Sequence, residues 1–133
     1  MAENGLVTVT SAHDFGTTLA RLVAALGAKG ITIFARIDHA AGAAGAGLAL
    51  RPTTLLVFGN PVAGTPLMQA AQTAGIDLPL KALVWQDADG TVRLSYNDPA
   101  WVAARHAIGE RVDPAIAALR AGIEALARHA TGA

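Results

Sequence analysis

The stretch over residues 51–99 constrains the fold more than any other part of this sequence, because signals for several elements follow one another without a gap. Its segment LLVFG at 55–59 is apolar at every position, which is typical of a strand covered on both faces. An Asn-Pro pair ends that strand, and a Thr-Pro pair at 65–66 predicts the start of a helix. Two further strands, over 80–86 and 91–97, flank the turn sequence DADG.

The rest of the chain supplies partners for these elements. Residues 5–10 and 31–38 predict two more strands, and residues 12–28 predict an amphipathic helix whose N-cap is Ser11. A last helix begins near Asp113, and the alanine- and glycine-rich segment 39–47 is either a loose helix or a mobile loop. The order β-α-β-β-α-β-β-α predicts an α+β fold. We expect a single mixed, largely antiparallel, curved sheet of about five strands with helices mainly on one face.

Size and charge narrow the class of protein. The chain has 133 residues, which fits a single domain over 1–133. Hydrophobic residues make up 53% and charged residues 15%, so part of the surface is expected to lie against a partner, most simply in a homodimer. Ten basic and ten acidic residues balance to zero charge, which argues against partners such as nucleic acid or an anionic membrane.

Residue types and segments that the sequence lacks exclude further kinds of site and of targeting or membrane segment. The chain has no cysteine, which excludes disulfides, thiolate catalysis and cysteine-based metal sites. Its N-terminus lacks a basic stretch followed by a long apolar run, so we expect no signal peptide. No window has about 18 uninterrupted apolar residues, and a cytoplasmic location is expected.

Five motifs resemble the bacterial and archaeal domain-of-unknown-function 302 family. They are DHAAGA at 38–43, LRPTTLLVFGNP at 50–61, AGTPLMQAA at 63–71, GIDLPLKALVWQDADG at 75–90 and LSYNDP at 94–99. The resemblance implies an α+β fold similar to the TATA-binding protein, with a curved sheet and helices on one face. It also implies a homodimer, but no activity or cofactor. Val62 departs from the family pattern, in which a lysine usually stands in the NPxAGTP turn.

His39 is the first candidate for chemistry. Strand alternation places it on the face of Ile33, Ala35 and Ile37, at the end of the strand. An imidazole there could bind a metal or haem iron, or act as a general base near neutral pH. The alternative is a hydrogen-bonded core histidine, because no second ligand stands two or four residues away.

Other candidates fall at the ends of strands and helices. The turn from Asn60 to Thr65 could bind an anion at a helix N-terminus, or simply form a capped turn. Tyr96 and Asn97 end a hairpin arm and could serve a ligand, the core or an interface. We therefore predict a ligand pocket at one end of the sheet. Its predicted residues are His39, Asn60, Met68, Tyr96 and Asn97.

Three functions are compatible with this sequence. The first is a homodimeric domain that binds a small molecule in this pocket. The second is an enzyme with His39 as general base and Asp38 or Asp98 as a supporting carboxylate, although alternation places Asp38 on the opposite face. The third is a structural or interaction domain. For the dimer, Trp101 and Val102 are the expected contact patch.

Overall fold

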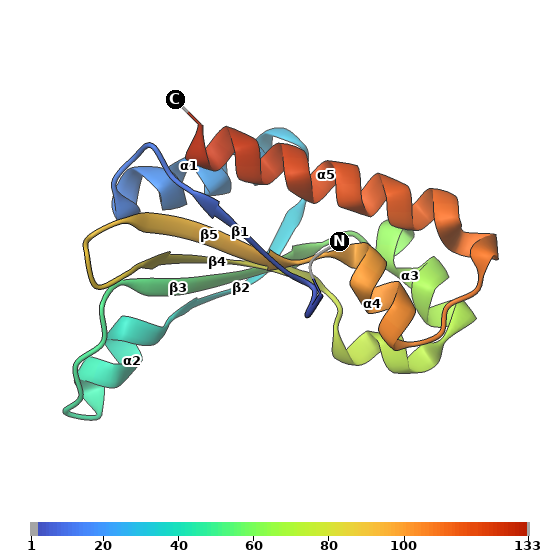
Figure 1. The fold of residues 1–133 in the computed structure, drawn as a ribbon, viewed down its shortest axis with the longest axis horizontal. Helices are drawn as coiled ribbons and strands as arrows, with labels where there is room; N and C mark the ends of the chain where they lie inside the picture. Colours follow the sequence, from blue (N-terminus) through green and yellow to red (C-terminus); the bar gives the residue numbers. More distant parts are fainter. Residues whose placement is uncertain (1–2, 133) are drawn as a thin grey trace.

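A computed structural model describes residues 3–132 as one five-stranded sheet with helices (Figure 1). The strands follow the spatial order β1-β5-β4-β3-β2, and all four pairings are antiparallel. Their bounds are β1 Leu6–Thr10, β2 Thr32–Asp38, β3 Thr53–Gly59, β4 Leu80–Gln86 and β5 Val92–Asn97. The α+β class is confirmed, and the sheet within the described residues is antiparallel rather than mixed.

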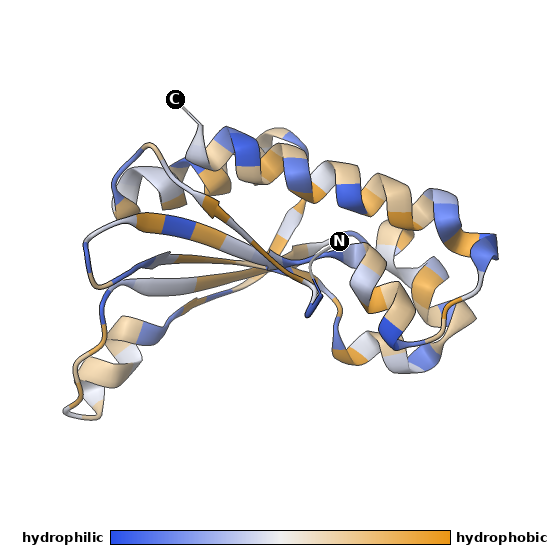
Figure 2. Ribbon diagram, in the orientation of Figure 1, coloured by the Kyte–Doolittle hydropathy of each residue, from blue (hydrophilic) through white to orange (hydrophobic). Residues whose placement is uncertain are grey.

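Helices α1 (Phe15–Ala28) and α5 (Asp113–Thr131) lie on the same side of the sheet (Figure 1). Hydrophobic residues recur along the strands and along α5 (Figure 2), as expected for elements that bury one face. The main core joins these two helices to β3, β4 and β5. Its most buried members are Leu22, Leu26, Leu56, Phe58, Val84, Leu94 and Ala130.

The N-cap of α1 is Asp14 rather than the predicted Ser11. The Asp14 carboxylate accepts a hydrogen bond from the Thr17 N–H at 2.7 Å. Hydrogen bonds from Thr17 stabilise the charged carboxylate and lower the pKa of Asp14. The Ser11 hydroxyl instead bonds the Thr18 hydroxyl at 2.6 Å. The helix therefore begins three residues later than predicted.

A second, smaller cluster lies at one end of the sheet. It is formed by α3 (Pro61–Ala70), the 3₁₀ helix η1 (Gln72–Ile76), α4 (Pro99–Arg105), η2 (Glu110–Val112) and the first half of α5. Helix α4 was not predicted. It buries Val102, which is 2% exposed, so Val102 is not available to the expected dimer patch. Trp101, also on α4, packs its ring against Gly5.

The second face of the sheet, here called the open face, lies opposite α1 and α5. One row of paired residues crosses it from Ile37 through Leu55, Leu83 and Ser95 to Thr8. Its apolar side chains are exposed or half-buried. They are Leu6, Ala35, Ile37, Leu55, Val57, Leu83 and Trp85.

Helix α2 (His39–Gly45) occupies the alanine- and glycine-rich segment and projects away from the sheet (Figure 1). The Asp38 carboxylate caps it by accepting from the Ala41 N–H at 2.9 Å. None of its residues is buried. The sequence left this segment open between a helix and a loop, and the structure assigns a short helix.

Candidate functional site

An apolar pocket of about 300 Å³ opens where β3 runs into α3. Twelve residues line it, none of them charged, and the only polar side chains among them are those of Asn60 and Thr65. The full lining is Phe34, Gly59, Asn60, Pro61, Ala63, Gly64, Thr65, Met68, Leu78, Pro79, Leu80 and Leu119. Pockets for small molecules are typically apolar, with a few polar groups that fix orientation.

Asn60 is one of the two polar residues that line this pocket. It is the N-cap of α3, and its Oδ1 accepts from the Val62 N–H at 2.9 Å. Its backbone carbonyl accepts from the N–H groups of Ala63 and Gly64 at 2.9 and 3.1 Å. The helix thus begins at Pro61, and the cap predicted at Thr65 lies inside it. Because Asn60 occupies these N–H groups, the predicted anion site at this turn is not supported.

A bulge in β2 brings Phe34 to the pocket. Ile33 pairs with Phe58, but Ala35 pairs with Val57, so Phe34 is an extra residue between them. The bulge moves Ala35 and Ile37 to the open face, whereas the sequence predicted that they share the face of Ile33. Simple alternation could not show this shift.

His39 lies far from this pocket. Thr32 pairs with Gly59 beside Asn60, and Asp38 pairs with Thr54 at the other end of the strand. Six residue steps of about 3.3 Å separate the two ends, or about 20 Å. The predicted grouping of His39 with Asn60 and Met68 is therefore wrong: only the latter two line one pocket.

The partners proposed for His39 as a general base are engaged elsewhere. The Asp38 carboxylate caps α2, and Asp98 is 2% exposed and caps α4 by accepting from the Ala100 N–H at 2.9 Å. Asp98 also pairs with Arg120 at 3.3 Å. Within residues 3–132, no hydrogen bond or ion pair reaches the exposed His39 ring, and no three His, Cys, Asp or Glu side chains gather as a metal site.

Tyr96 and Asn97 point to opposite faces of β5. Tyr96 is 6% exposed and belongs to the main core beneath α5, where burial raises its pKa and the nearby Glu124 raises it further. Asn97 pairs with Leu6 and shares its face. Neither residue lines the pocket, so Tyr96 serves the core, one of the alternatives left open by the sequence.

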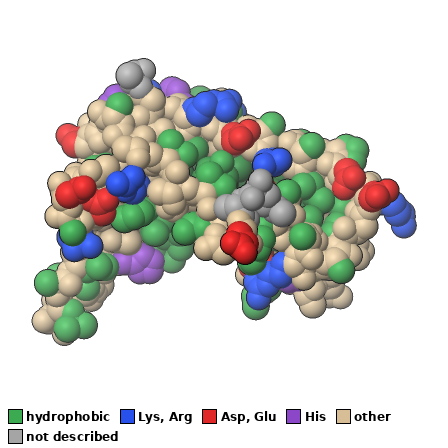
Figure 3. All heavy atoms as spheres, in the orientation of Figure 1, with side chains coloured by type: hydrophobic (Ala, Val, Ile, Leu, Met, Phe, Trp, Pro, Cys, Tyr) green, Lys and Arg blue, Asp and Glu red, His purple; other side chains and the backbone are tan. Residues whose placement is uncertain are grey.

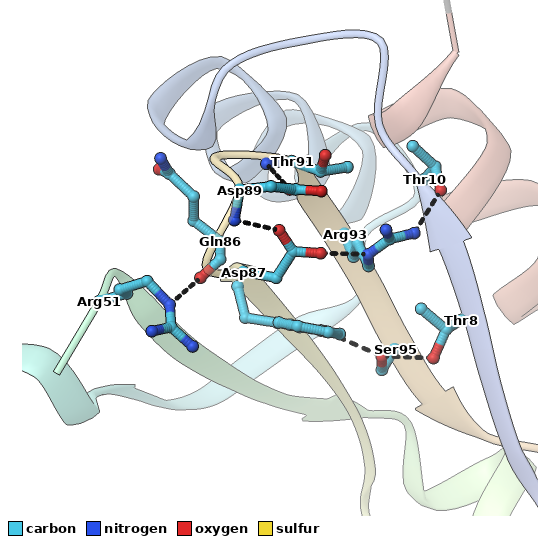
Figure 4. Close-up of polar contacts among 10 residues, drawn as sticks. Thr8, Thr10, Arg51, Gln86, Asp87, Asp89, Thr91, Arg93 and Ser95 are labelled. Carbon is cyan, nitrogen blue, oxygen red and sulfur yellow. Dashed lines mark hydrogen bonds and ion pairs between the residues drawn. The ribbon is translucent and has the colours of Figure 1, made fainter.

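A polar network lies on the open face beside the hairpin turn (Figure 4). The Ser95 hydroxyl bonds the Thr8 hydroxyl at 2.8 Å and accepts from the Trp85 Nε1–H at 2.9 Å. Arg93 donates to Asp87 at 2.9 Å and to Thr10 at 2.8 Å. The two aspartates of the DADG sequence accept hydrogen bonds within the turn, which agrees with the hairpin turn predicted there.

A second polar cluster joins η1 to the end of α4 and was missed by sequence reasoning. His106 Nε2 lies 2.5 Å from an oxygen of Asp77, and its Nδ1 lies 2.9 Å from the Thr73 hydroxyl. Arg105 donates to both oxygens of Asp77 at 2.9 and 3.0 Å. No local pattern could reveal it, since Asp77 and His106 are 29 residues apart.

Comparisons with known proteins agree with this fold. The family described as "Domain of unknown function DUF302" matches residues 7–126. A solved structure, the uncharacterized conserved protein DUF302 from Bacillus stearothermophilus, superposes with a TM-score of 0.83 at 19% identity. The superposition covers 95% of this chain and 98% of that one, and at this identity it speaks for the fold alone.

Two curated relatives carry the name Fluoride-specific ion channel FluC 1. They come from Brucella suis biovar 1 (strain 1330) and Brucella abortus biovar 1 (strain 9-941). Each is 48% identical over 130 residues, or 98% of this chain, which covers 51% and 48% of them respectively. The chain thus spans about half the length of these relatives. No helix among residues 3–132 combines the length and the apolar character needed to cross a bilayer.

Proposed function

The chain belongs to the DUF302 family of domains of unknown function, and we propose that it binds a small, uncharged, largely apolar molecule in the pocket between β3 and α3. The observation that carries this proposal is the lining, in which ten of twelve residues are apolar or glycine and none is charged. Burying apolar ligand surface there contributes about 25 cal/mol per Å². The side-chain amide of Asn60, a lining residue, can donate to a carbonyl or hydroxyl oxygen of the ligand.

Enzyme activity has less support. Asp38 and Asp98, the two carboxylates predicted to support His39 as a general base, each cap a helix. The pocket has no titratable side chain in its lining. A binding domain needs only the pocket. Of the predicted ligand residues, Asn60 and Met68 belong to this proposal.

The fluoride-channel name belongs to proteins about twice as long as this chain. In our proposal, the half that matches this chain is a binding domain attached to the part that conducts fluoride. The similarity of nearly the whole chain to nearly the whole of a separate solved protein supports an independently folded domain. An apolar pocket is also a poor site for a small anion.

We include two further features in this proposal. The domain acts as a homodimer, which is supported by its low content of charged residues and by exposed apolar side chains such as Leu6, Ile37 and Leu48. A cytoplasmic location stays a prediction from the sequence.

Calorimetry and thermal shifts with three probes test the pocket. We expect n-octanol to bind and raise the melting temperature, since a ligand at roughly 100 times its Kd stabilises the folded state by about 2.7 kcal/mol. Octanoate should bind at least about tenfold more weakly, because no cation in the lining offsets the desolvation of its carboxylate. Fluoride should have no effect.

A pair of variants at Gly64 assigns the binding to this pocket. A Cβ at Gly64 would lie 3.8 Å from Leu78 Cδ1, an ordinary contact. Gly64→Ala is therefore expected to fold and bind octanol normally, whereas Gly64→Leu fills the pocket and abolishes binding. Equal octanol affinity in both variants, or tighter binding of octanoate, would contradict the proposal.

A further inference from the structure

Helix α2 contacts β3 where it leaves the sheet, but none of its residues is buried within the described chain. Its seven residues HAAGAAG include two glycines and no buried side chain. Isolated helices shorter than about 12–15 residues are marginal in water, and each glycine weakens them further. The segment that follows exposes Leu48 by 68% and Leu50 by 49%. An apolar projection of this kind, here called the arm (residues 39–50), needs a surface to cover it.

The open face likewise exposes apolar side chains that no part of the described chain covers. Leu6 is 50% exposed and Ile37 is 41% exposed, and the arm leaves the sheet after Asp38, the residue that follows Ile37. Figure 3 shows the molecule hollowed between the projecting α2 and the end that holds α4. The arm and the hollow thus lie beside one another on one molecule.

Most polar groups of the open face have partners, and the ammonium of Lys81, which lies beside Val57 on this face, donates to the Asp77 carbonyl at 3.4 Å. Trp85, Ser95 and Thr8 form one hydrogen-bonded set, and the Arg93 guanidinium is paired with Asp87 (Figure 4). Covering this face therefore leaves no charge of these groups unpaired. This pairing favours a partner of low net charge, and a second copy of this chain, with zero formal net charge, meets that condition.

The size of the face explains why the arm is needed. Five strands about 4.8 Å apart and about six residues long present a projected area of about 480 Å². A stable interface takes about 800 Å² from each partner. The face alone falls short of this, and the arm supplies further area.

We propose that the open face and the arm together form a two-fold interface between two copies, with the arm of each copy seated in the hollow of the other. Two-fold symmetry requires a self-complementary patch, and a projection next to a hollow is one. This inference rests on the proposed homodimer and names the surface that forms it.

Sedimentation equilibrium on the full chain tests the interface. The wild-type protein should have twice the 13.5 kDa chain mass at micromolar concentration. Ile37→Asp, on the open face, and Leu48→Asp, on the arm, should each weaken the dimer at least tenfold. Val62→Asp is the matched control, because Val62 is 82% exposed and lies on α3, outside the open face and the arm. This control should remain dimeric.

The outcomes separate the two proposals. A wild-type monomer at every concentration overturns the homodimer and this interface together. A wild-type dimer that persists in both Ile37→Asp and Leu48→Asp, or that is lost in Val62→Asp, overturns the interface alone. Circular dichroism checks that each variant is folded. Because Leu48 lies outside the sheet, Leu48→Asp still tests the dimer interface if Ile37→Asp fails to fold.

Discussion

Tyr96 is the only tyrosine of the chain, so the rise in tyrosinate absorbance with pH reports the ionisation of this residue alone. Burial raises its pKa above the ordinary value of 10.0, and Glu124 and Asp98 add to this. Below pH 10 the folded and unfolded states both keep the proton. Above pH 10 the unfolded state loses it first, so the free energy of unfolding falls as pH rises toward the folded-state pKa.

We therefore expect the tyrosinate absorbance of the folded protein to rise at a higher pH than that of the chain in denaturant. Tyr96→Phe should abolish the signal and flatten the alkaline loss of stability, which urea unfolding at several pH values measures. A folded-state midpoint at or below that of the denatured chain would show that Tyr96 is not buried under α5.

At the scale of elements, the cluster of Asp77, His106 and Thr73 links η1 to the end of α4. The His106 side chain is 7% exposed and that of Asp77 13%, so their contact is largely shielded from water. Groups in direct contact are coupled, whereas groups more than about 7–10 Å apart usually contribute independently. The two elements should therefore lose stability together when this contact is broken.

A double-mutant cycle with Asp77→Asn and His106→Ala measures this coupling. We expect an interaction energy of about 0.5–3 kcal/mol from urea unfolding. A second cycle between His106→Ala and Lys29→Ala serves as the control, since Lys29 follows α1 and has no contact with the cluster. A coupling energy near zero in the first cycle would mean that the contact contributes nothing to stability.

Most helices and strands could be predicted from the sequence, but some of their boundaries and contacts could not. Apolar runs and alternation located all five strands and helices α1 and α5, because these patterns are local. The start of α3 was misplaced, since Asn60-Pro61 and Thr65-Pro66 are both valid helix starts and only packing selects the first. The bulge at Phe34 and the contact of Asp77 with His106 depend on pairing between distant segments. Of the five residues predicted for the pocket, Asn60 and Met68 line the cavity between β3 and α3, whereas His39 lies at the far end of β2.

At the scale of the whole molecule, α5 connects the two clusters of buried side chains. Ile116 is buried in the cluster with α3 and α4, and Ile123 and Leu126 are buried in the main core. A single helix that serves both clusters should make them unfold in one transition. This also bears on the single domain predicted for residues 1–133, which stays a prediction.

Gly122 lies in α5 between the parts that serve these clusters, and a Cβ added there would meet no atom within 4 Å. Gly122→Ala should therefore raise the free energy of unfolding by about 0.8–1.0 kcal/mol, the difference in helix propensity between the two residues. Because the helix is shared, hydrogen exchange should slow for Leu67 in the small cluster and for Leu22 in the main core alike. Gly27→Ala in α1, which also meets no atom within 4 Å, should slow exchange in both clusters too, because a stabilisation anywhere in one cooperative unit is shared by the whole. Two separate unfolding transitions, or slower exchange on only one side of Gly122, would contradict the view of α5 as the element that makes this chain one cooperative unit.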